Sequence, residues 1–470
     1  KLPMKFFDTK LLGDLLQRIE DHRRVEQFLT SSSLSLLFSF FTFLVFGIVL
    51  AVYNVGIFLV FLLGTSLYAG WIVLFLRKRR QLDYKYFEQA GRNRNVTYQL
   101  IGGMQEIKLQ GCEQRKRWEW EDVQADLFKV NLQSLNLQQI QQAGSITINE
   151  VKNILITVLA ATAVIHGNMT LGMMLAVQYI IGQLNSPVEQ LIQFIYSWQD
   201  VSISLDRMNE IHTETNEENV ERTRTAYTDK TTEGHSLTIK DLSFKYDIYS
   251  SKDILSNINL SIPNGKVTAI VGPSGSGKTT LIKLLLGFYE PLNGNIQIGN
   301  ANLNEYNLEW WRSQCGTVMQ EGYLFSDTIA RNIAISDDEP GIERIRHAAR
   351  VANIADYIEA LPLTYNTMIG QDGQGVSQGQ RQRILIARVV YKNPTFVFLD
   401  EATNALDANN ERAITENLSE FYKGKTVVVV AHRLSTVRNA DQIVVLDEGK
   451  IVEVGTHEEL TAKRGKYFAL

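Results

Sequence analysis

Two long stretches of the chain contain no Asp, Glu, Lys or Arg, and they limit what it can fold into more than any other feature. They cover residues 31–76 and 153–188 of the 470-residue sequence. A membrane-spanning helix needs about 20 apolar residues, so the first stretch is too long for one span and fits two. We expect these spans at about 34–53 and 57–76, with a turn at Asn54 and Gly56 between them.

A second pair of spans is expected at about 140–165 and 171–195, with a turn at 167–170. Four adjacent cations, Arg77 to Arg80, follow the first pair and mark the cytoplasmic side of the membrane. The alternative interpretation of these cations is a patch that binds nucleic acid. The net charge of −4 argues against nucleic acid as a partner.

The polar, Gln-rich residues 77–139 contain no proline, which favours helices that continue from the membrane into the cytosol. About 30 residues of such a stalk reach roughly 45 Å. Gly102, Gly103 and Gly111 are the expected breaks between the descending and ascending stalks. A soluble coiled coil is the alternative, and the charge-free flanks argue against it.

Two ionisable residues, Glu150 and Lys152, lie within the third expected span. A charge near the centre of a membrane helix costs about 2.5–3.5 kcal/mol, so it normally faces a partner or a watery cavity. Residues two apart lie on different helix faces. Either one lines a cavity while the other pairs, or both lie shallow enough to be solvated; the sequence leaves both interpretations open.

The composition changes in the second half of the chain. Residues 212–235 are polar and aperiodic and are expected to form a linker, and short apolar runs typical of strands begin after it. We therefore predict a membrane domain over 1–211 and a soluble domain over 236–470. Cys112 and Cys315 lie far apart in segments that resemble cytosolic sequence, which favours free thiols in a reducing compartment.

A phosphate-binding loop follows the predicted strand 266–271. The sequence GPSGSGKT at residues 272–279 matches the pattern G-x-x-x-x-G-K-[ST] between a strand and an apolar helix. Glycines let backbone N–H groups surround phosphate oxygens, while the lysine meets the outer phosphates and the threonine ligates Mg²⁺. The candidate nucleotide-binding residues are Gly272, Ser274, Gly275, Ser276, Gly277, Lys278, Thr279 and Thr280.

A second apolar strand ends in two carboxylates, Asp400 and Glu401. Asp400 is placed to hold Mg²⁺, and Glu401 directly after it can polarise the attacking water. The alternative role of Glu401 is a solvent-exposed acid at a strand end. The phosphate loop and this carboxylate pair lie farther apart in sequence than one crossover connection between parallel strands needs. We therefore expect a further subdomain inserted between them.

Within that insertion, the sequence GVSQGQ at residues 375–380 precedes a predicted helix over 381–390. Its Ser377 at a helix N-terminus forms another candidate anion site. Each chain already has a phosphate loop for its own nucleotide, so this second anion site is available for a nucleotide bound to another chain. We therefore expect two chains to share their sites.

Together these motifs resemble the ATP-binding cassette of ABC transporters, and the fusion to membrane helices resembles an ABC exporter. The signature of that family reads LSGGQ, and residues 376–380 match three of its five positions, including Ser377, Gly379 and Gln380. Gln378 stands where the family has glycine. Gln371 stands where exporters usually carry glutamate, with Asp372 beside it.

The resemblance implies roles for further residues. Tyr246 corresponds to the aromatic residue that stacks on adenine, Gln320 to the sensor glutamine, and Asp407 to the D-loop. His432 falls where the switch histidine contacts the γ-phosphate. The implied cofactors are ATP and Mg²⁺. The implied catalytic residues are Glu401, His432 and Gln320, and the implied Mg²⁺ ligands are Thr279, Gln320 and Asp400.

The resemblance covers nearly all of the 470 residues. It implies a helical membrane domain, with four of the six helices of an exporter and long stalks, fused to an α/β P-loop cassette with a helical subdomain. It also implies that two membrane helices precede Lys1. The expected assembly is a homodimer or heterodimer of half-transporters in the cytoplasmic membrane, in contact with lipid and with the cassettes in the cytosol.

Residues 2–8, LPMKFFD, are most similar to exporters of bacteriocins and peptides, many of which carry an N-terminal protease domain. The expected substrate is therefore a peptide or bacteriocin-like molecule. A lipid or drug exporter is the alternative within transport. A cytosolic cassette ATPase acting on DNA or ribosomes shares the motifs but lacks charge-free stretches, and the cassette of an importer is usually a separate chain.

Overall fold

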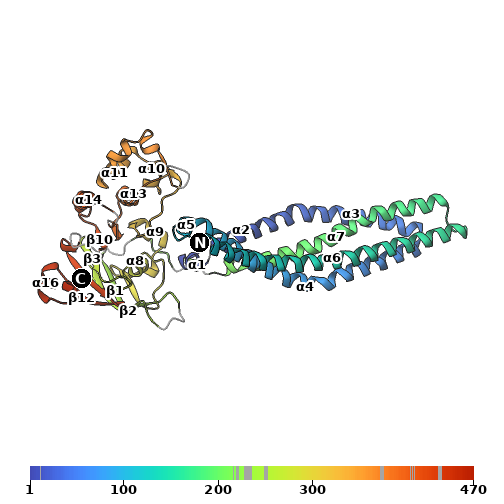
Figure 1. Ribbon diagram of the computed structural model, residues 1–470, viewed down its shortest axis with the longest axis horizontal. Coiled ribbons are helices and arrows are strands. Elements are labelled where there is room, and N and C mark those ends of the chain that lie inside the picture. Colours follow the sequence, from blue (N-terminus) through green and yellow to red (C-terminus); the bar gives the residue numbers. More distant parts are fainter. Residues whose placement is uncertain are drawn as a thin grey trace. The chain divides into compact units, whose positions relative to one another are not determined.

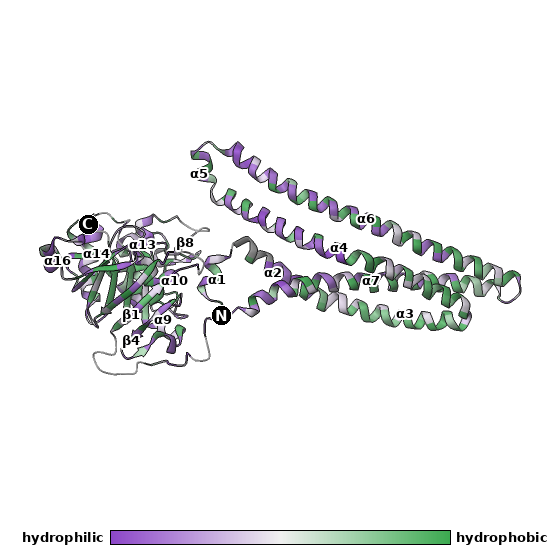
Figure 2. Ribbon diagram, turned by 90° about the horizontal axis from the view of Figure 1, so that it is seen from below, coloured by the Kyte–Doolittle hydropathy of each residue, from purple (hydrophilic) through white to green (hydrophobic). Residues whose placement is uncertain are grey.

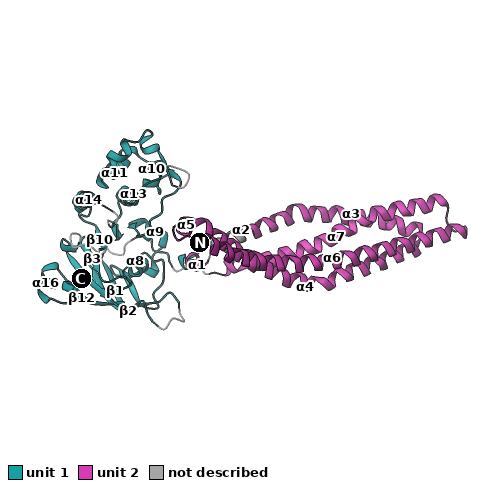
Figure 3. Cartoon of the chain, viewed as in Figure 1, with its two compact units in different colours: residues 1, 3–5, 216–470 teal, residues 2, 6–215 magenta. Residues whose placement is uncertain are grey.

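The computed structural model describes residues 1–10, 12–214, 216–218, 222–226, 236–247, 252–370, 375–402, 404, 406, 408–431 and 437–469. The chain divides into two compact units (Figure 3): residues 2 and 6–215 form a helical unit, and residues 1, 3–5 and 216–470 form the cassette unit. Within the described ranges, the helical unit contains only helices and turns, while the cassette unit combines three sheets with helices. The predicted fold class is therefore confirmed.

The helical unit consists of long helices interrupted where the sequence predicts turns. Asn54 ends the first apolar helix and caps the next, because its side chain accepts a hydrogen bond from the backbone N–H of Ile57 at 3.1 Å. Gly102 ends the descending stalk, and Gly111, with φ of 59°, precedes the ascending one. The helices are α1 (Met4–Thr9), α2 (Leu12–Gln27), the π-helical turn η1 (Phe28–Ser32), α3 (Ser33–Tyr53), α4 (Val55–Gly102), α5 (Met104–Leu109), α6 (Glu113–Ile165) and α7 (Leu171–Thr213).

Figure 1 shows α4 and α6 running side by side, and α3 packs along α7. Apolar residues gather at the ends of α4, α6 and α7 remote from α5, while the ends of these helices nearer α5 are more polar, and α3 is largely apolar along its length (Figure 2). Among the described residues, three helical segments are long and apolar enough to cross a membrane: Arg18–Tyr53, Val55–Gly102 and Glu113–Ile165. The fourth expected span, over 171–195, lies in α7, which is not among these three, and it stays a prediction.

The two ionisable residues of the third expected span have different environments. Lys152 is buried, its ammonium donates to Asn185 Oδ1 at 3.3 Å, and it lies 4.7 Å from the centre of the Phe61 ring. Gly64 makes room for the lysine stem, since a Cβ there would approach Lys152 Cγ to 2.6 Å. Glu150 is exposed on another face of α6. Lys152 therefore joins α4, α6 and α7, and the interpretation in which one residue pairs fits its contacts.

The cassette unit is built around a six-stranded sheet with the order β12-β11-β3-β10-β9-β6, in which every pairing except that of β11 with β12 is parallel. An antiparallel sheet of order β2-β1-β4-β5 packs over one apolar core with it. The strands of the larger sheet are β3 (Val267–Val271), β6 (Cys315–Val318), β9 (Phe396–Asp400), β10 (Thr426–Val430), β11 (Gln442–Asp447) and β12 (Lys450–Gly455). The others are β1 (Leu237–Phe244), β2 (Leu255–Ile262), β4 (Asn293–Ile298), β5 (Ala301–Asn302), and the pair β7 (Asp327–Thr328) and β8 (Met368–Ile369).

The expected inserted subdomain lies between β6 and β9 and is mainly helical. Its apolar residues share a second core with the other face of the large sheet. The cassette helices are α8 (Lys278–Leu285), α9 (Leu308–Gln314), α10 (Ile329–Ile333), α11 (Ile342–Val351), α12 (Ala355–Glu359), α13 (Gln378–Lys392), α14 (Ala408–Phe421), α16 (His457–Lys463) and α17 (Lys466–Ala469), with short 3-10 turns η3 (Leu303–Glu305) and η4 (Thr364–Asn366).

Candidate functional site

The carboxyl ends of four neighbouring parallel strands bring the predicted motifs to one edge of the large sheet. Val430 of β10 is in register with Ile270 of β3 and with Asp400 of β9, and Leu399 is in register with Val318 of β6. The phosphate loop after β3, Asp400 at the end of β9 and Gln320 after β6 therefore lie at the same level of the sheet. This edge is where open α/β sheets bind ligands.

The phosphate loop needs glycine at two positions for steric reasons. Gly272 has φ of 153°, and a Cβ there would approach the carbonyl oxygen of Leu446 to 2.0 Å. Gly277 has φ of 102°, and a Cβ there would approach Leu255 Cδ2 to 2.6 Å. Side chains are thus excluded from the positions where the loop turns back on itself, which leaves backbone N–H groups to line it.

Lys278 begins α8 and is buried. Its ammonium donates to the carbonyl oxygens of Gly272 and Pro273, both at 2.9 Å, so it lies across the mouth of the loop. Burial lowers the pKa of Lys278, and the nearby carboxylates of Glu401 and Asp400 oppose that effect. A bound phosphate would supply further negative charge to the same ammonium.

The hydroxyl of Ser276, also buried in the loop, has no hydrogen-bond partner among the described residues. A buried hydroxyl of this kind normally has an acceptor. A phosphate oxygen seated in the loop would provide one, so the loop fits the nucleotide that its sequence predicts.

Asp400 and Glu401 lie in different environments. Asp400 is fully buried at the end of β9, whereas the carboxylate of Glu401 is half-buried and accepts hydrogen bonds from the amides of Gln320 at 3.2 Å and Asn404 at 2.7 Å. Gln382 donates to the Glu401 carbonyl at 3.2 Å. Glu401 is therefore fixed by several donors at the edge beside Lys278, which does not fit a freely solvated strand-end acid.

Glu401 also adopts a left-handed backbone conformation, with φ of 53°. Such a conformation is costly for a residue other than glycine and is concentrated at functional sites. The contacts of Asn404 and Gln382 with Glu401 were not predicted from the sequence. The position of Asn404, three residues after Glu401, was the only signal for it, because an Asn at a strand end readily bonds its near neighbours.

The donor set fits Mg²⁺, which prefers oxygen ligands. The side chains that would hold it are those of Thr279, in the first turn of α8, Asp400 and Gln320. Because Gln320 uses its amide nitrogen to bond Glu401, its amide oxygen is left to serve as a ligand.

Tyr246 lies in a cluster of aromatic rings. Its ring meets those of Phe244 and Tyr289 edge-on, each at a centroid distance of 5.0 Å, and its hydroxyl lies 3.2 Å from Thr280 Oγ1. The side chain is 39% exposed. A partly exposed ring held beside the phosphate-loop helix is positioned to stack on a planar base.

Ser377 is the N-cap of α13, as the sequence predicts. Its hydroxyl accepts from Gln380 N at 3.2 Å, and the Gln380 side chain accepts from Ser377 N at 2.8 Å, which is a capping box. Ser377 is exposed, and these bonds stay within its own loop. Gln378, the departure from the family glycine, is the first residue of α13, where a helical backbone accommodates any side chain.

Four residues singled out in the sequence, Gln371, Asp372, Asp407 and His432, lie outside the described residues. Their roles remain as the sequence predicts them. The described neighbour of Asp407, Leu406, is buried, and Ala431 directly after β10 is buried as well.

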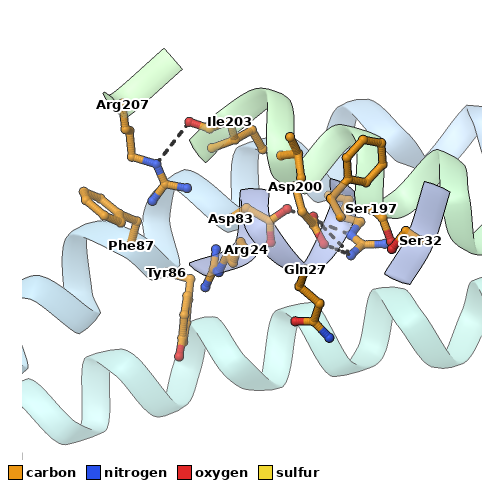
Figure 4. A pocket seen from close by; sticks show the side chains of 13 residues that line it. Arg24, Gln27, Ser32, Asp83, Tyr86, Phe87, Ser197, Asp200, Ile203 and Arg207 are labelled. Carbon is orange, nitrogen blue, oxygen red and sulfur yellow. Dashed lines mark hydrogen bonds and ion pairs between the residues drawn. The ribbon is translucent and has the colours of Figure 1, made fainter. Parts of the chain in front are cut away.

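The helical unit contains a separate cavity of about 400 Å³ between α2, α4 and α7 (Figure 4). Arg79 donates to both oxygens of Asp200, at 3.2 and 3.3 Å, and lies 3.9 Å from Asp83. Arg207 lies 4.0 Å above the Phe87 ring. Burial raises the pKa of both Asp83 and Asp200, and Arg79 opposes the effect.

Beside this cavity, the fully buried Asp21 of α2 accepts from Ser204 Oγ at 2.9 Å and lies 3.7 Å from Arg207 Nε. Opposite charges from α2, α4 and α7 are thus paired just after the apolar part of α4. The pairing joins these helices at that level of the unit.

The phosphate loop, the carboxylate pair and the signature-like loop, joined in one chain to long apolar helices, define an ABC transporter of the exporter class. Comparison with known families agrees. The family described as "ABC transporter" matches residues 255–404, and the family described as "ABC transporter transmembrane region" matches residues 1–188. The chain belongs to the ABC transporters, with membrane helices and a cytosolic cassette.

Curated relatives refine this placement. The chain is 35% identical over 466 residues to the alpha-hemolysin translocation ATP-binding protein HlyB of Escherichia coli. It is also 35% identical to the toxin RTX-I translocation ATP-binding protein of Actinobacillus pleuropneumoniae and to the leukotoxin translocation ATP-binding protein LktB of Mannheimia haemolytica. Each match covers 98% of this chain and 64% of the relative, so the chain spans slightly less than two thirds of their length.

A solved structure, described as a bacterial Atm1-family ABC exporter with ATP bound, has the same fold. It matches with a TM-score of 0.88 and 26% sequence identity, covering 100% of this chain and 81% of that one. The exporter architecture predicted from the sequence is therefore confirmed.

Proposed function

We propose that the chain is an ATP-hydrolysing subunit of an exporter that moves a polypeptide out of the cytoplasm. The observation that carries the proposal is the edge of the large sheet, where Lys278 of the phosphate loop lies beside a Glu401 held by Gln320 and Asn404. This edge belongs to the same chain as the long apolar helices.

In this proposal ATP binds with its phosphates in the loop and its adenine against Tyr246. Lys278 turns from the Gly272 and Pro273 carbonyls to the outer phosphates, and the backbone N–H groups and the N-terminus of α8 add positive potential. The side chains of Thr279, Gln320 and Asp400 would hold Mg²⁺, which when bound would neutralise phosphate charge. Water is excluded from one side of the site by the buried strand ends.

Glu401 accepts a hydrogen bond from the attacking water and orients it toward the γ-phosphate. Its left-handed backbone and its two amide donors hold the carboxylate in one orientation before the nucleotide arrives. Preorganisation of this kind lowers the barrier because no reorientation is needed during the reaction.

The active assembly in this proposal is a dimer with two shared sites. The exposed loop that contains Ser377, Gly379 and Gln380 covers the phosphate loop of the partner subunit, where its helix N-terminus meets the γ-phosphate. Asp407 and His432 complete the contacts, as the family resemblance implies. Loss of the γ-phosphate on hydrolysis removes charge that holds the two cassettes together, and the stalk helices carry that motion to the membrane.

The substrate class rests on the relatives, which are named for translocating alpha-hemolysin, RTX-I toxin and leukotoxin. We propose a protein or peptide substrate for this chain on that basis. The narrower prediction of a bacteriocin-like molecule depends on residues 2–8 alone.

The test uses the purified full-length protein in lipid nanodiscs. ATP turnover is measured alone, with a reduced and carboxymethylated unfolded protein, with added phospholipid vesicles and with a hydrophobic dye. If the unfolded protein stimulates ATP turnover and this turnover is lost in Lys278→Ala, the proposal is supported. Stimulation only by lipid or dye would instead support a lipid or drug exporter, and turnover that survives Lys278→Ala would contradict the site.

A further inference from the structure

The segment after α7 is polar and aperiodic, and its composition predicts a flexible linker. Its described residues, 216–218 and 222–226, nevertheless make specific contacts with the cassette, and we name them the strap. Arg224 forms a parallel bridge with Tyr306. Its N–H donates to the Glu305 carbonyl at 3.0 Å, and its carbonyl accepts from Asn307 N at 2.9 Å.

Side chains of the strap extend this docking. Glu218 accepts from the Asn307 side chain at 2.7 Å and from Glu309 N at 3.1 Å, which places an acid at the N-terminus of α9. Arg222, whose side chain is only 7% exposed, donates to Glu290 at 2.5 Å. Backbone and side-chain bonds therefore hold the strap along one face of the cassette.

A bidentate ion pair of the strap joins Glu217 to Arg312 of α9. The two side chains form a bidentate pair at 2.7 and 2.9 Å and are 14% and 27% exposed. A bidentate, largely buried pair of this kind is strong and fixes the geometry of both partners.

Arg312 also holds the end of the phosphate-loop helix. Its guanidinium donates to the carbonyl oxygen of Leu286 at 3.2 Å and of Gly287 at 2.8 Å, directly after α8, and it lies 4.9 Å from the centre of the Phe288 ring. Its neighbour Trp311 donates to the Leu285 carbonyl at 3.0 Å. A cation at these carbonyls complements the negative end of the helix dipole.

Arg312 is connected to the phosphate-loop side of the nucleotide site through α8 and to the Gln320 side through β6. The helix α8 is only eight residues long, about 12 Å, and its other end carries Lys278 and Thr279. In the chain, α9 continues directly into β6, which leads to Gln320 and hence to Glu401. Upstream, three residues separate the end of α7 from Glu217.

We propose that the Glu217–Arg312 pair is a positioning contact that couples the end of α7 to the phosphate-loop helix through a docked strap. This inference rests on the proposed function, since it concerns ATP use at that site. Movement of α7 pulls on Glu217, Glu217 shifts Arg312, and Arg312 shifts the C-terminal end of α8. Arg312 is a positioning residue, because it touches the helix and not the nucleotide.

The first test measures docking without any turnover. In full-length protein in nanodiscs, hydrogen exchange of peptides spanning 222–226 and 303–309 reports the two backbone bonds of Arg224. We expect protection of at least tenfold over the unstructured rate in wild type, with faster exchange in Glu217→Gln. Exchange at the unstructured rate in wild type would overturn the docked strap, whatever the ATPase activity.

The second test measures coupling. Glu217→Gln should raise the KM for ATP about three- to tenfold with kcat within twofold, Glu217→Asp should recover part of that loss, and Glu217→Gln added to Arg312→Gln should cause no further change. Glu416→Gln, which breaks the exposed Arg412–Glu416 pair, is the matched control. A KM equal to that of the control would overturn the coupling, as would additive effects in the double variant.

Lys278→Ala is assayed in the same preparation to separate this inference from the proposed function. If Lys278→Ala keeps full turnover, the proposed nucleotide site is wrong. If Lys278→Ala is inactive and Glu217→Gln equals the control, only the strap coupling is wrong. A lower thermal midpoint of Glu217→Gln without a change in KM would show a structural role alone and would likewise contradict the coupling.

Discussion

Replacing Glu401 by glutamine tests the chemistry of the site most sharply. One carboxylate oxygen of Glu401, Oε2, accepts hydrogen bonds from the side-chain amides of both Gln320 and Asn404. A glutamine of the same shape can place its one amide oxygen at the position of Oε2 and keep both bonds, but an NH₂ group, which cannot accept a proton, replaces the second carboxylate oxygen. The variant therefore loses the proposed base that receives the water proton and the negative charge that strengthens both bonds.

The size of the effect follows from these two losses. A hydrogen bond to a charged acceptor contributes about 1.5–3 kcal/mol, and general-base catalysis contributes at least about a hundredfold in rate. We expect Glu401→Gln to slow ATP turnover about 10²-fold or more, which is about 2.7 kcal/mol in the activation barrier. ATP affinity should change little, because the phosphate loop is intact.

The assay is steady-state phosphate release in nanodiscs, with ATP affinity measured separately by a fluorescent nucleotide. Asn404→Ala keeps the carboxylate and removes one of its donors, so it should slow turnover by an intermediate factor of about ten. Glu416→Gln serves as the surface control. Turnover of Glu401→Gln within threefold of wild type would refute the assignment of Glu401.

Three further predictions test the binding step, the cysteines and the topology. Lys278→Ala should weaken ATP binding at least tenfold, because it removes the buried ammonium at the mouth of the loop, and equilibrium binding of a fluorescent nucleotide checks this. Burial raises the pKa of the Cys315 thiol, so iodoacetamide at pH 8 should alkylate the half-buried Cys112 and leave Cys315 unmodified in the native protein. Mass spectrometry of the labelled protein checks this, and equal labelling of the two cysteines would contradict the packing of β6. In intact cells a membrane-impermeant maleimide should label a cysteine placed at the exposed Asn168 but not Cys112, and labelling of Cys112 would contradict the stalk assignment.

Local patterns predicted the elements around the candidate site well. The phosphate loop, the strand that ends in Asp400 and the N-cap at Ser377 each depend on a few consecutive residues, and all three elements form where expected. The helix breaks at Asn54 and Gly111 are also local, since a cap and a left-handed φ suffice to end a helix. The parallel sheet then brings the phosphate loop and the end of the strand with Asp400 to the same edge.

Contacts between distant segments could not be predicted in the same way. The Asn185 and Phe61 partners of Lys152, and the Gly64 that makes room for it, lie on other helices and have no pattern that links them. The same holds for Glu217 and Arg312. An acidic, aperiodic segment indicates a solvated linker by composition, and only the fold places an arginine opposite it.

In the proposed dimer, two chains share each nucleotide site. A chain with Lys278→Ala is paired with one carrying Ser377→Arg in a disulfide-trapped heterodimer, and ATP turnover is compared with both mutant homodimers. If sites are shared, one site of the heterodimer carries both lesions and the other carries none. We predict that the homodimers are nearly inactive and that the heterodimer regains a substantial part, up to about half, of wild-type turnover. A heterodimer as inactive as the two homodimers would contradict the shared site.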